Sequence, residues 1–175
     1  MAAIIEFYNG EIVHPKGFTP GYIWQWPDQV LESEHTYIQW LFPLTVTSQY
    51  VESSPILTAD EISEFKASPD LQSRLLRSFV VMLKFYGFSM DEAPDKNGKP
   101  RITEGPDFFY KKDNWLTPHN HNLLRISRIL GSLTLLGLGR YAIAFHEALL
   151  KVNKDFPGII HANSVEIWGR AVTPH

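Results

Sequence analysis

The stretch from Ser68 to Gly87 constrains the fold most, because it contains every feature of one long amphipathic helix. Ser68, Pro69 and Asp70 supply an N-cap, a proline suited to the first turn and an acid at the positive end of the helix dipole. Gly87 stands where a left-handed C-cap belongs. Apolar residues recur mostly three or four positions apart, at Leu71, Leu75, Phe79, Met82, Leu83 and Tyr86. The stretch therefore predicts a helix with one apolar face.

Further helices are expected on both sides of this one. Thr19 and Pro20 begin a short turn that Pro27 ends, and a longer helix should run from about Asp28 to Leu41 before Pro43. Residues before Thr19 are expected to form an extended arm. Thr58 and Glu61 form a capping box at the start of a short helix. Later helices are predicted from either Thr117-Pro118 or Asn122 to Gly137, from Gly139 to about Asn153, and from Asn163 through Trp168.

Two connections are long. Leu44 to Leu57 has no clear period and should cross the surface. Ser89 to Leu116 contains an Asn97-Gly98 turn, but its mixed polarity lacks the alternation of a hairpin, so we predict a long loop. Such a loop exceeds the usual ~12 to 15 residues and is a candidate lid or binding loop.

These elements predict an all-α fold, with residues 1–175 forming a single compact domain. About five to six helices of unequal length are expected, joined by one long ordered loop. The 175 residues, 44% of them hydrophobic, are enough to bury a sizeable core.

Composition excludes several classes of protein. The formal net charge of −3 argues against a nucleic-acid-binding domain, which usually carries a basic surplus. Without cysteine there is no disulfide or thiolate ligand, which suits a reducing compartment, and we expect a cytoplasmic protein. No apolar run approaches the ~20 residues that span a bilayer, so any membrane association would be peripheral. The chain lacks a phosphate loop, a nucleophile elbow and a dinucleotide fingerprint, so no cofactor is expected.

Candidate site residues cluster in two strings. His35 and Gln39 are four apart, so on a helix they would share a face and offer an imidazole and an amide to one ligand. His119 and Asn120 precede a helix whose free amide hydrogens favour an anion, and Arg125 could clamp a carboxylate. The alternatives are a structural histidine, an elaborate N-cap and a core ion pair. The histidines could hold a metal only if residues 119–121 were extended, and without a well-spaced third ligand we expect none.

The aromatic residues suggest a wall for a flat ligand. Trp24, Trp40, Phe42 and Tyr86 are the candidates, although aromatic residues at helical spacing more often pack a core.

Several strings of the sequence together resemble one known family. They are FYNG at 7–10, HTYIQWLFP at 35–43, LTADEISEF at 57–65, LLRSF and MLKFYG between 75 and 87, and HNLLRISRIL at 121–130. In this order they resemble the conserved region of the opioid growth factor receptor family. The resemblance implies a helical domain that in animals belongs to an enkephalin-binding receptor associated with membranes and the nucleus. We expect this chain to be a short stand-alone relative.

Three functions follow as hypotheses. The first is a receptor-like domain that binds a short peptide or an aromatic small molecule with an anionic end in an interhelical pocket. Its ligand-binding residues would be Trp24, His35, Gln39, Trp40, Tyr86, His119, Asn120 and Arg125. The second is a cofactor-free enzyme of specialised metabolism, a cyclase or isomerase with His35 or His119 as catalytic acid or base. The third, a protein-interaction module, would have no pocket.

Overall fold

The computed structural model describes residues 3–51, 54–91 and 95–174. The described helices are α1 (Ala3–Asn9), α2 (Pro20–Ile23), α3 (Asp28–Ser33), α4 (Ile38–Leu41), α5 (Ala59–Ala67), α6 (Pro69–Tyr86), α7 (Phe108–Lys111), η1 (Lys112–Asn114, a 3-10 helix), α8 (Asn122–Leu135), α9 (Gly139–Asp155) and α10 (Ala162–Ala171). The strands are β1 (Phe88–Met90) and β2 (Ile102–Glu104).

α6 is the helix that the capped stretch predicts, and its predicted ends are confirmed. The Ser68 hydroxyl accepts a hydrogen bond from the Leu71 amide, and Gly87 has a left-handed backbone with φ of 92°. A side chain at Gly87 would also meet the backbone of Phe108 at 2.9 Å. Glycine is therefore required there by both conformation and space.

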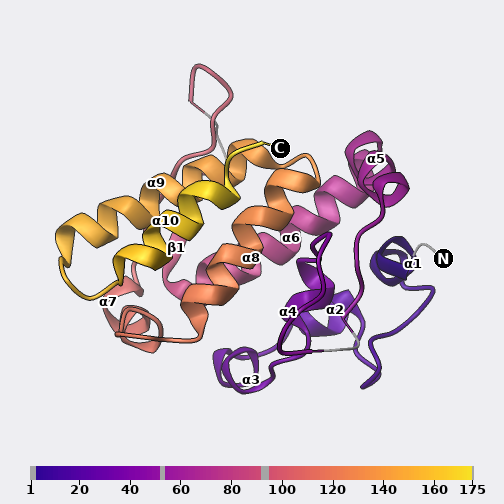
Figure 1. Ribbon diagram of the computed structural model, residues 1–175, viewed down its shortest axis with the longest axis horizontal. Helices are drawn as coiled ribbons and strands as arrows, with labels where there is room; N and C mark the ends of the chain where they lie inside the picture. The colour runs from indigo at the N-terminus through magenta and orange to yellow at the C-terminus, as the bar shows by residue number, and fades with distance from the viewer. Residues whose placement is uncertain (1–2, 52–53, 92–94, 175) are drawn as a thin grey trace.

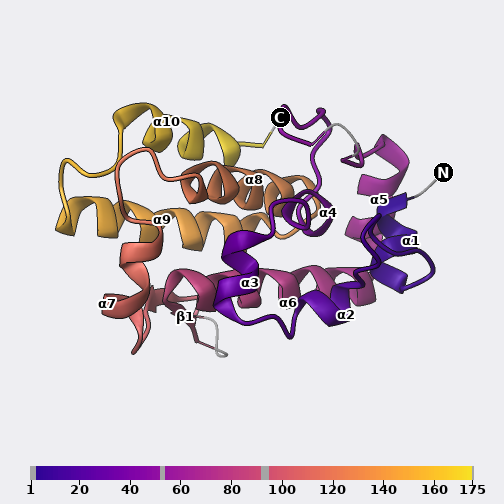
Figure 2. The same cartoon turned by 90° about the horizontal axis from the view of Figure 1, so that it is seen from below.

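The long helices form three layers (Figure 2). α6 lies on one face, α8 and α9 lie next to each other in the middle, and α10 covers the opposite face. Fully buried side chains fill the space between layers, among them Phe79 of α6, Ile126 of α8 and Phe145 of α9. Full burial of each such side chain contributes about 1.5–3 kcal/mol, so this apolar stack is the main source of stability. The short helices α1 and α5 lie at one end of the stack and α7 lies at the other (Figure 1). α3 lies between these ends, where its Asp28 pairs with Lys111 of α7 at 3.0 Å.

The N-terminal residues form α1, so the prediction of an extended arm is wrong. Ile4, Ile5, Phe7 and Tyr8 are all buried. The Tyr8 hydroxyl lies 2.7 Å from the Leu41 carbonyl oxygen, to which it donates. A seven-residue helix without a capping signal depends on such tertiary contacts, which leave no local trace in the sequence.

The fold-class prediction is also wrong, because the described residues form ten α-helices rather than five or six and contain a small antiparallel sheet. β1 and β2 pair with Phe88 opposite Glu104 and Met90 opposite Ile102. This hairpin lies in the segment predicted to be a loop. Strands of three residues and helices of four are too short to show a period, so packing rather than pattern determines them. Residues 52–53 and 92–94 of the two predicted loops lie outside the described residues.

The predicted helix over Asp28–Leu41 is interrupted. α3 ends at Ser33, Glu34 adopts an extended conformation (φ −82°, ψ 128°), and α4 begins only at Ile38. The other long predicted helices are continuous, and the capping box of Thr58 and Glu61 is confirmed.

Candidate functional site

A groove of about 1330 Å³ runs along α8, which forms its floor. One wall comes from His35, from α4 and from residues 44–50, and the other comes from α10. Ile62 and Lys66 of α5 border it as well, and residues 119–121 border it just before the N-terminus of α8. Four helices and the connections beside them, far apart in sequence, therefore contribute to one surface.

Arg125 connects α8 to the interruption between α3 and α4. Its guanidinium donates to the carbonyl oxygens of Leu31 at 2.8 Å and Glu34 at 2.9 Å, although its side chain comes from α8. These carbonyls lie where α3 ends and lack partners in a continuing helix. Arg125 is 6% exposed, so it is a buried cation whose partners are mainly backbone dipoles.

The same guanidinium determines how His35 meets the groove. A nitrogen of Arg125 lies 3.2 Å from Nδ1 of His35. Because a guanidinium can only donate, Nδ1 must accept, and the neutral ring then carries its proton on Nε2. His35 is exposed and lines the groove, so it offers a ligand an N–H donor.

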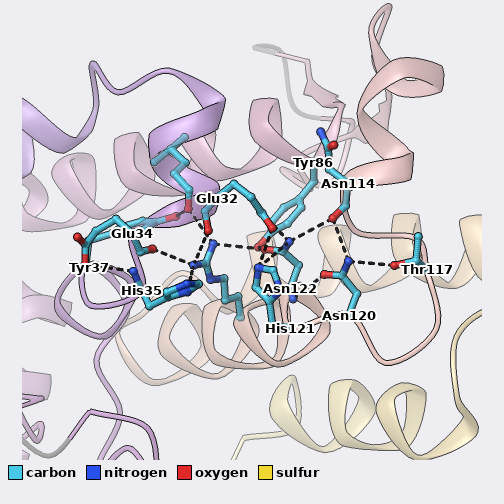
Figure 3. A network of polar contacts seen from close by, with 12 residues as sticks. Glu32, Glu34, His35, Tyr37, Tyr86, Asn114, Thr117, Asn120, His121 and Asn122 are labelled. Atoms are coloured by element: carbon cyan, nitrogen blue, oxygen red, sulfur yellow. Dashed lines mark hydrogen bonds and ion pairs between the residues drawn. The ribbon is translucent and has the colours of Figure 1, made fainter.

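Glu32 and His121 extend this polar network. Nε2 of His121 lies 2.8 Å from Oε1 of Glu32, and the Asn122 side-chain amide donates to Oε2 of Glu32 at 3.0 Å. The rings of His35 and His121 are 5.8 Å apart and meet edge to face. One edge of the groove therefore holds two imidazoles that are both fixed by second contacts (Figure 3).

Asn120 has a structural role before α8, whereas the His119 side chain is exposed. The Asn120 side chain accepts from the Asn122 amide at 2.9 Å and donates to the Asn114 carbonyl at 3.0 Å, so it fixes the turn that leads into α8. His119 is exposed and has a positive φ of 56°, in the left-handed region that favours glycine. Its ring lies 6.3 Å from that of His161.

Glu34 stabilises the turn that carries His35. Burial raises its pKa, but hydrogen bonds from Lys16 and Thr36 outweigh burial and bring the pKa from 4.5 to about 2. Its carboxylate accepts from the backbone amides of both His35 and Thr36. Nearby, burial lowers the pKa of His14, whose Nε2 faces the Thr36 carbonyl at 3.3 Å. The turn is therefore held from both sides by buried or partly buried polar groups.

The structure brings together five of the eight residues that the sequence indicates for ligand binding. The residues that line the groove are His35, Gln39, His119, Asn120 and Arg125. His35 and Gln39 do so without sharing a helix, since His35 lies in the turn before α4. In the amide orientation that satisfies its neighbours, Gln39 donates to the carbonyls of His35 and Thr36, so it closes this turn.

The aromatic candidates lie elsewhere. Trp24 donates from Nε1 to Ser78 at 2.8 Å, and the guanidinium of Arg77 stacks over its ring at 4.5 Å. Trp40 packs against Phe7, and Tyr86 is fully buried. Phe42 is fully buried too. None of these four rings lines the groove as the described residues form it.

Sequence reasoning missed Glu32, His121 and Asn122 as members of this network. His121 lies in the same HNHN string as His119, so the string carried a signal. Glu32 carried none, because its contacts join residues 89 and 90 positions away. Arg128, one helical turn after Arg125, also lines the groove.

Neither a metal cluster nor a membrane-spanning helix is present among residues 3–51, 54–91 and 95–174. No group of three or more histidine, aspartate or glutamate side chains in these ranges could hold a metal ion. No helix in these ranges is long and apolar enough to cross a membrane.

Comparison with known proteins gives a consistent answer. A family model described as the opioid growth factor receptor (OGFr) conserved region matches residues 2–168. The rat opioid growth factor receptor is 40% identical over 141 residues, which cover 78% of this chain and 23% of the receptor. The human receptor is 35% identical over 162 residues, covering 89% of this chain and 23% of the receptor. The opioid growth factor receptor-like protein 1 of Xenopus tropicalis is 39% identical over 114 residues, or 65% of this chain and 21% of that protein.

The chain thus spans less than a quarter of the length of these relatives. No solved structure matches it significantly. The family model covers nearly all of the sequence, and it agrees with the resemblance carried by the HTYIQWLFP and HNLLRISRIL strings. The chain therefore belongs to the opioid growth factor receptor conserved-region family.

Proposed function

We propose that this chain is a receptor-like ligand-binding domain that takes a short peptide or an aromatic small molecule with an anionic group. The ligand would bind at the histidine end of the groove, by which we mean His35, His119, His121 and Arg125. The observation that carries the proposal is that the groove and the polar network meet here. The names of the relatives support a receptor-like role.

The chemistry of the histidine end suits a carboxylate. His35 offers an N–H whose direction is fixed by Arg125, and the buried Arg125 cation lies directly behind it. A hydrogen bond to a charged group is worth about 1.5–3 kcal/mol, more than a neutral one.

The test uses matched pairs of short aromatic peptides, each prepared with a free C-terminal carboxylate and as the C-terminal amide. Binding is measured by titration calorimetry and by NMR chemical-shift changes. We expect at least one free-acid peptide to bind about tenfold more tightly than its amide, since the amide loses the charged hydrogen bond. The variant His35→Ala should remove most of that difference, and the exposed Tyr110, outside the groove, provides the control Tyr110→Ala. Equal binding of acid and amide for every pair, or no binding at millimolar concentration, would contradict the proposal.

The alternative function, a cofactor-free cyclase or isomerase, stays a prediction. A general base needs a free lone pair at the atom that faces the substrate. Because Arg125 holds the lone pair of Nδ1, the neutral His35 presents a proton at Nε2 and suits an acid or donor better than a base. His119 has no such constraint, so an enzymatic role would depend on His119, and His119→Ala would abolish turnover.

A further inference from the structure

The groove extends well beyond the histidine end. Its floor residues on α8 run from Leu123 to Leu135, a rise of about 18 Å at 1.5 Å per residue. Lys66 lies at the far end, where the C-terminus of α8 turns into Gly137. The volume of the whole groove, about 1330 Å³, exceeds the ~300–1000 Å³ of typical small-molecule sites. A short ligand at the histidine end would leave most of the groove in solvent.

We call this remainder the α8–α10 trough. Its members are Leu44 to Tyr50, Ile62, Lys66, Leu124, Ser127, Arg128, Gly131, Thr134, Leu135, Ser164, Ile167, Arg170 and Ala171. Several of its apolar side chains are exposed: Leu124 is 50% exposed, Val46 62% and Tyr50 78%. Contiguous apolar side chains in a concave surface are typical of an interaction site. A partner that covered them would gain about 1.5–3 kcal/mol for each side chain that became fully buried.

The charges of the trough have one sign. Lys66, Arg128 and Arg170 line it, and no aspartate or glutamate does so among the residues that the structure describes, although the chain carries a formal net charge of −3. Arg170 pairs with the exposed Glu166 on α10. For Lys66 and Arg128, no carboxylate of the described ranges lies within ion-pair distance.

Of the three cations, Arg128 gives the strongest indication of an anionic partner. One of its guanidinium nitrogens donates to the Phe42 carbonyl at 3.1 Å, which anchors the side chain over the floor of the trough. Burial lowers its pKa, yet an arginine remains charged at neutral pH. A partly desolvated cation without an anion costs free energy, which a carboxylate from a partner would recover.

We propose that the α8–α10 trough docks an acidic amphipathic helix of a protein partner. Leucine-type side chains of that helix would cover Leu124, Leu135 and Ile167, and its carboxylates would face Arg128, Arg170 and Lys66. A helix of about 12 to 14 residues matches the length of the floor. This surface does not depend on the ligand proposed for the histidine end.

The probe is a fluorescein-labelled amidated peptide of about 14 residues, with leucine at helical spacing and glutamate elsewhere. Its counterpart has lysine in place of every glutamate. Fluorescence anisotropy should show binding of the glutamate peptide and at least tenfold weaker binding of the lysine peptide. Raising the salt concentration should weaken the former several-fold, because its ion pairs are partly exposed.

Variants locate the binding. Leu124→Asp should weaken the glutamate peptide at least tenfold, and its matched control is Leu150→Asp, on α9 and outside the trough, where the leucine is 39% exposed. Arg170→Gln should weaken it about threefold, with Arg140→Gln as control. His35→Ala should change it less than twofold, which separates this surface from the ligand site.

Four results would overturn the proposal. The glutamate peptide could fail to bind at about 1 mM, or the lysine peptide could bind equally well. Leu124→Asp and Leu150→Asp could have the same effect. Finally, a single-stranded oligonucleotide of similar charge could displace the peptide at equal concentration, which would indicate general polyanion binding instead.

Discussion

The segments 69–86 and 28–41 both carry apolar residues at helical spacing, but only the first is one continuous helix. α6 runs from Pro69 to Tyr86 with a cap at each end. In the other segment, α3 ends at Ser33, Glu34 is extended, and α4 begins at Ile38. The difference lies in where the backbone groups find partners. In α6 they bond within the helix, whereas the carbonyls of Leu31 and Glu34 accept from Arg125 and the amides of His35 and Thr36 donate to Glu34.

The comparison shows that an apolar stripe is compatible with a break if other groups satisfy the backbone. The opening also has a functional consequence. It turns His35 away from a helix face and places it beside Arg125 at the groove, where the two ring nitrogens have different roles. The continuous helix serves the core, and the interrupted segment builds the site.

The largest expected effect is that of Arg125→Met. It keeps the apolar stem but leaves the Glu34 carbonyl without its donor and the Leu31 carbonyl with only the Tyr37 hydroxyl, and we expect a loss of about 3 kcal/mol in the free energy of unfolding. Urea denaturation would measure it. Arg140→Met is the control, because Arg140 is exposed and should change stability by less than about 0.5 kcal/mol. An effect of Arg125→Met below about 1 kcal/mol would mean that the break does not depend on this side chain.

Next comes the end of the continuous helix. Gly87→Ala should cost about 2 kcal/mol, because φ is 92° and the new methyl group would approach the Phe108 backbone at 2.9 Å. Gly17→Ala separates the two causes. Gly17 has φ of 83° but nothing within 4 Å, so it should cost only the conformational term of about 1 kcal/mol. Equal losses in thermal denaturation would contradict the steric part of this account.

Glu34→Gln tests the turn through its pH dependence. The pKa of Glu34 falls from 4.5 to about 2 on folding, so the carboxylate stabilises the native state fully above pH 4.5. This contribution is lost as the pH falls toward 2. Allowing for solvent screening, we expect the variant to lose about 1–2 kcal/mol at pH 7. The difference from the wild type should shrink steadily between pH 4.5 and pH 2, and a difference independent of pH would contradict the assignment.

The smallest expected effect is at a local cap. Thr58→Ala removes the hydroxyl that accepts from the Glu61 amide at the start of α5, and should cost about 1 kcal/mol. Thr47→Ala, in the exposed connection before α5, is the matched control and should be nearly neutral. Chemical denaturation of both variants at neutral pH gives the comparison. If the two losses were equal, capping would not account for the helix start.

Helices with strong local signals could be predicted from the sequence. α5, α6, α8 and α9 have caps or apolar stripes longer than two turns, and their existence and approximate bounds were expected. The shorter helices and the strands could not be predicted from the sequence. α1 depends on contacts such as that of Tyr8 with Leu41, and the β1–β2 hairpin pairs strands of only three residues. Neither leaves enough positions for a pattern.

The candidate site was predictable to a similar degree. The strings that contain His35 and His119 drew attention to residues that line one groove, because rare polar residues stand out in apolar segments. Aromatic character alone indicates Trp24, Trp40 and Tyr86, and it does not distinguish a pocket wall from a core.

The sequence by itself determined the family, the long helices and the histidine and arginine strings, because caps, apolar periods and motifs are properties of neighbouring residues. Only the tertiary structure decided the break after Ser33, the pairing of Glu32 with His121 and the basic lining of the α8–α10 trough. These features depend on contacts between residues far apart in the chain, such as Arg125 and Leu31, which are 94 positions apart. Burying a polar group costs free energy unless the folded chain supplies a hydrogen-bond partner for it. That partner can be distant in the chain, so the local sequence does not identify it.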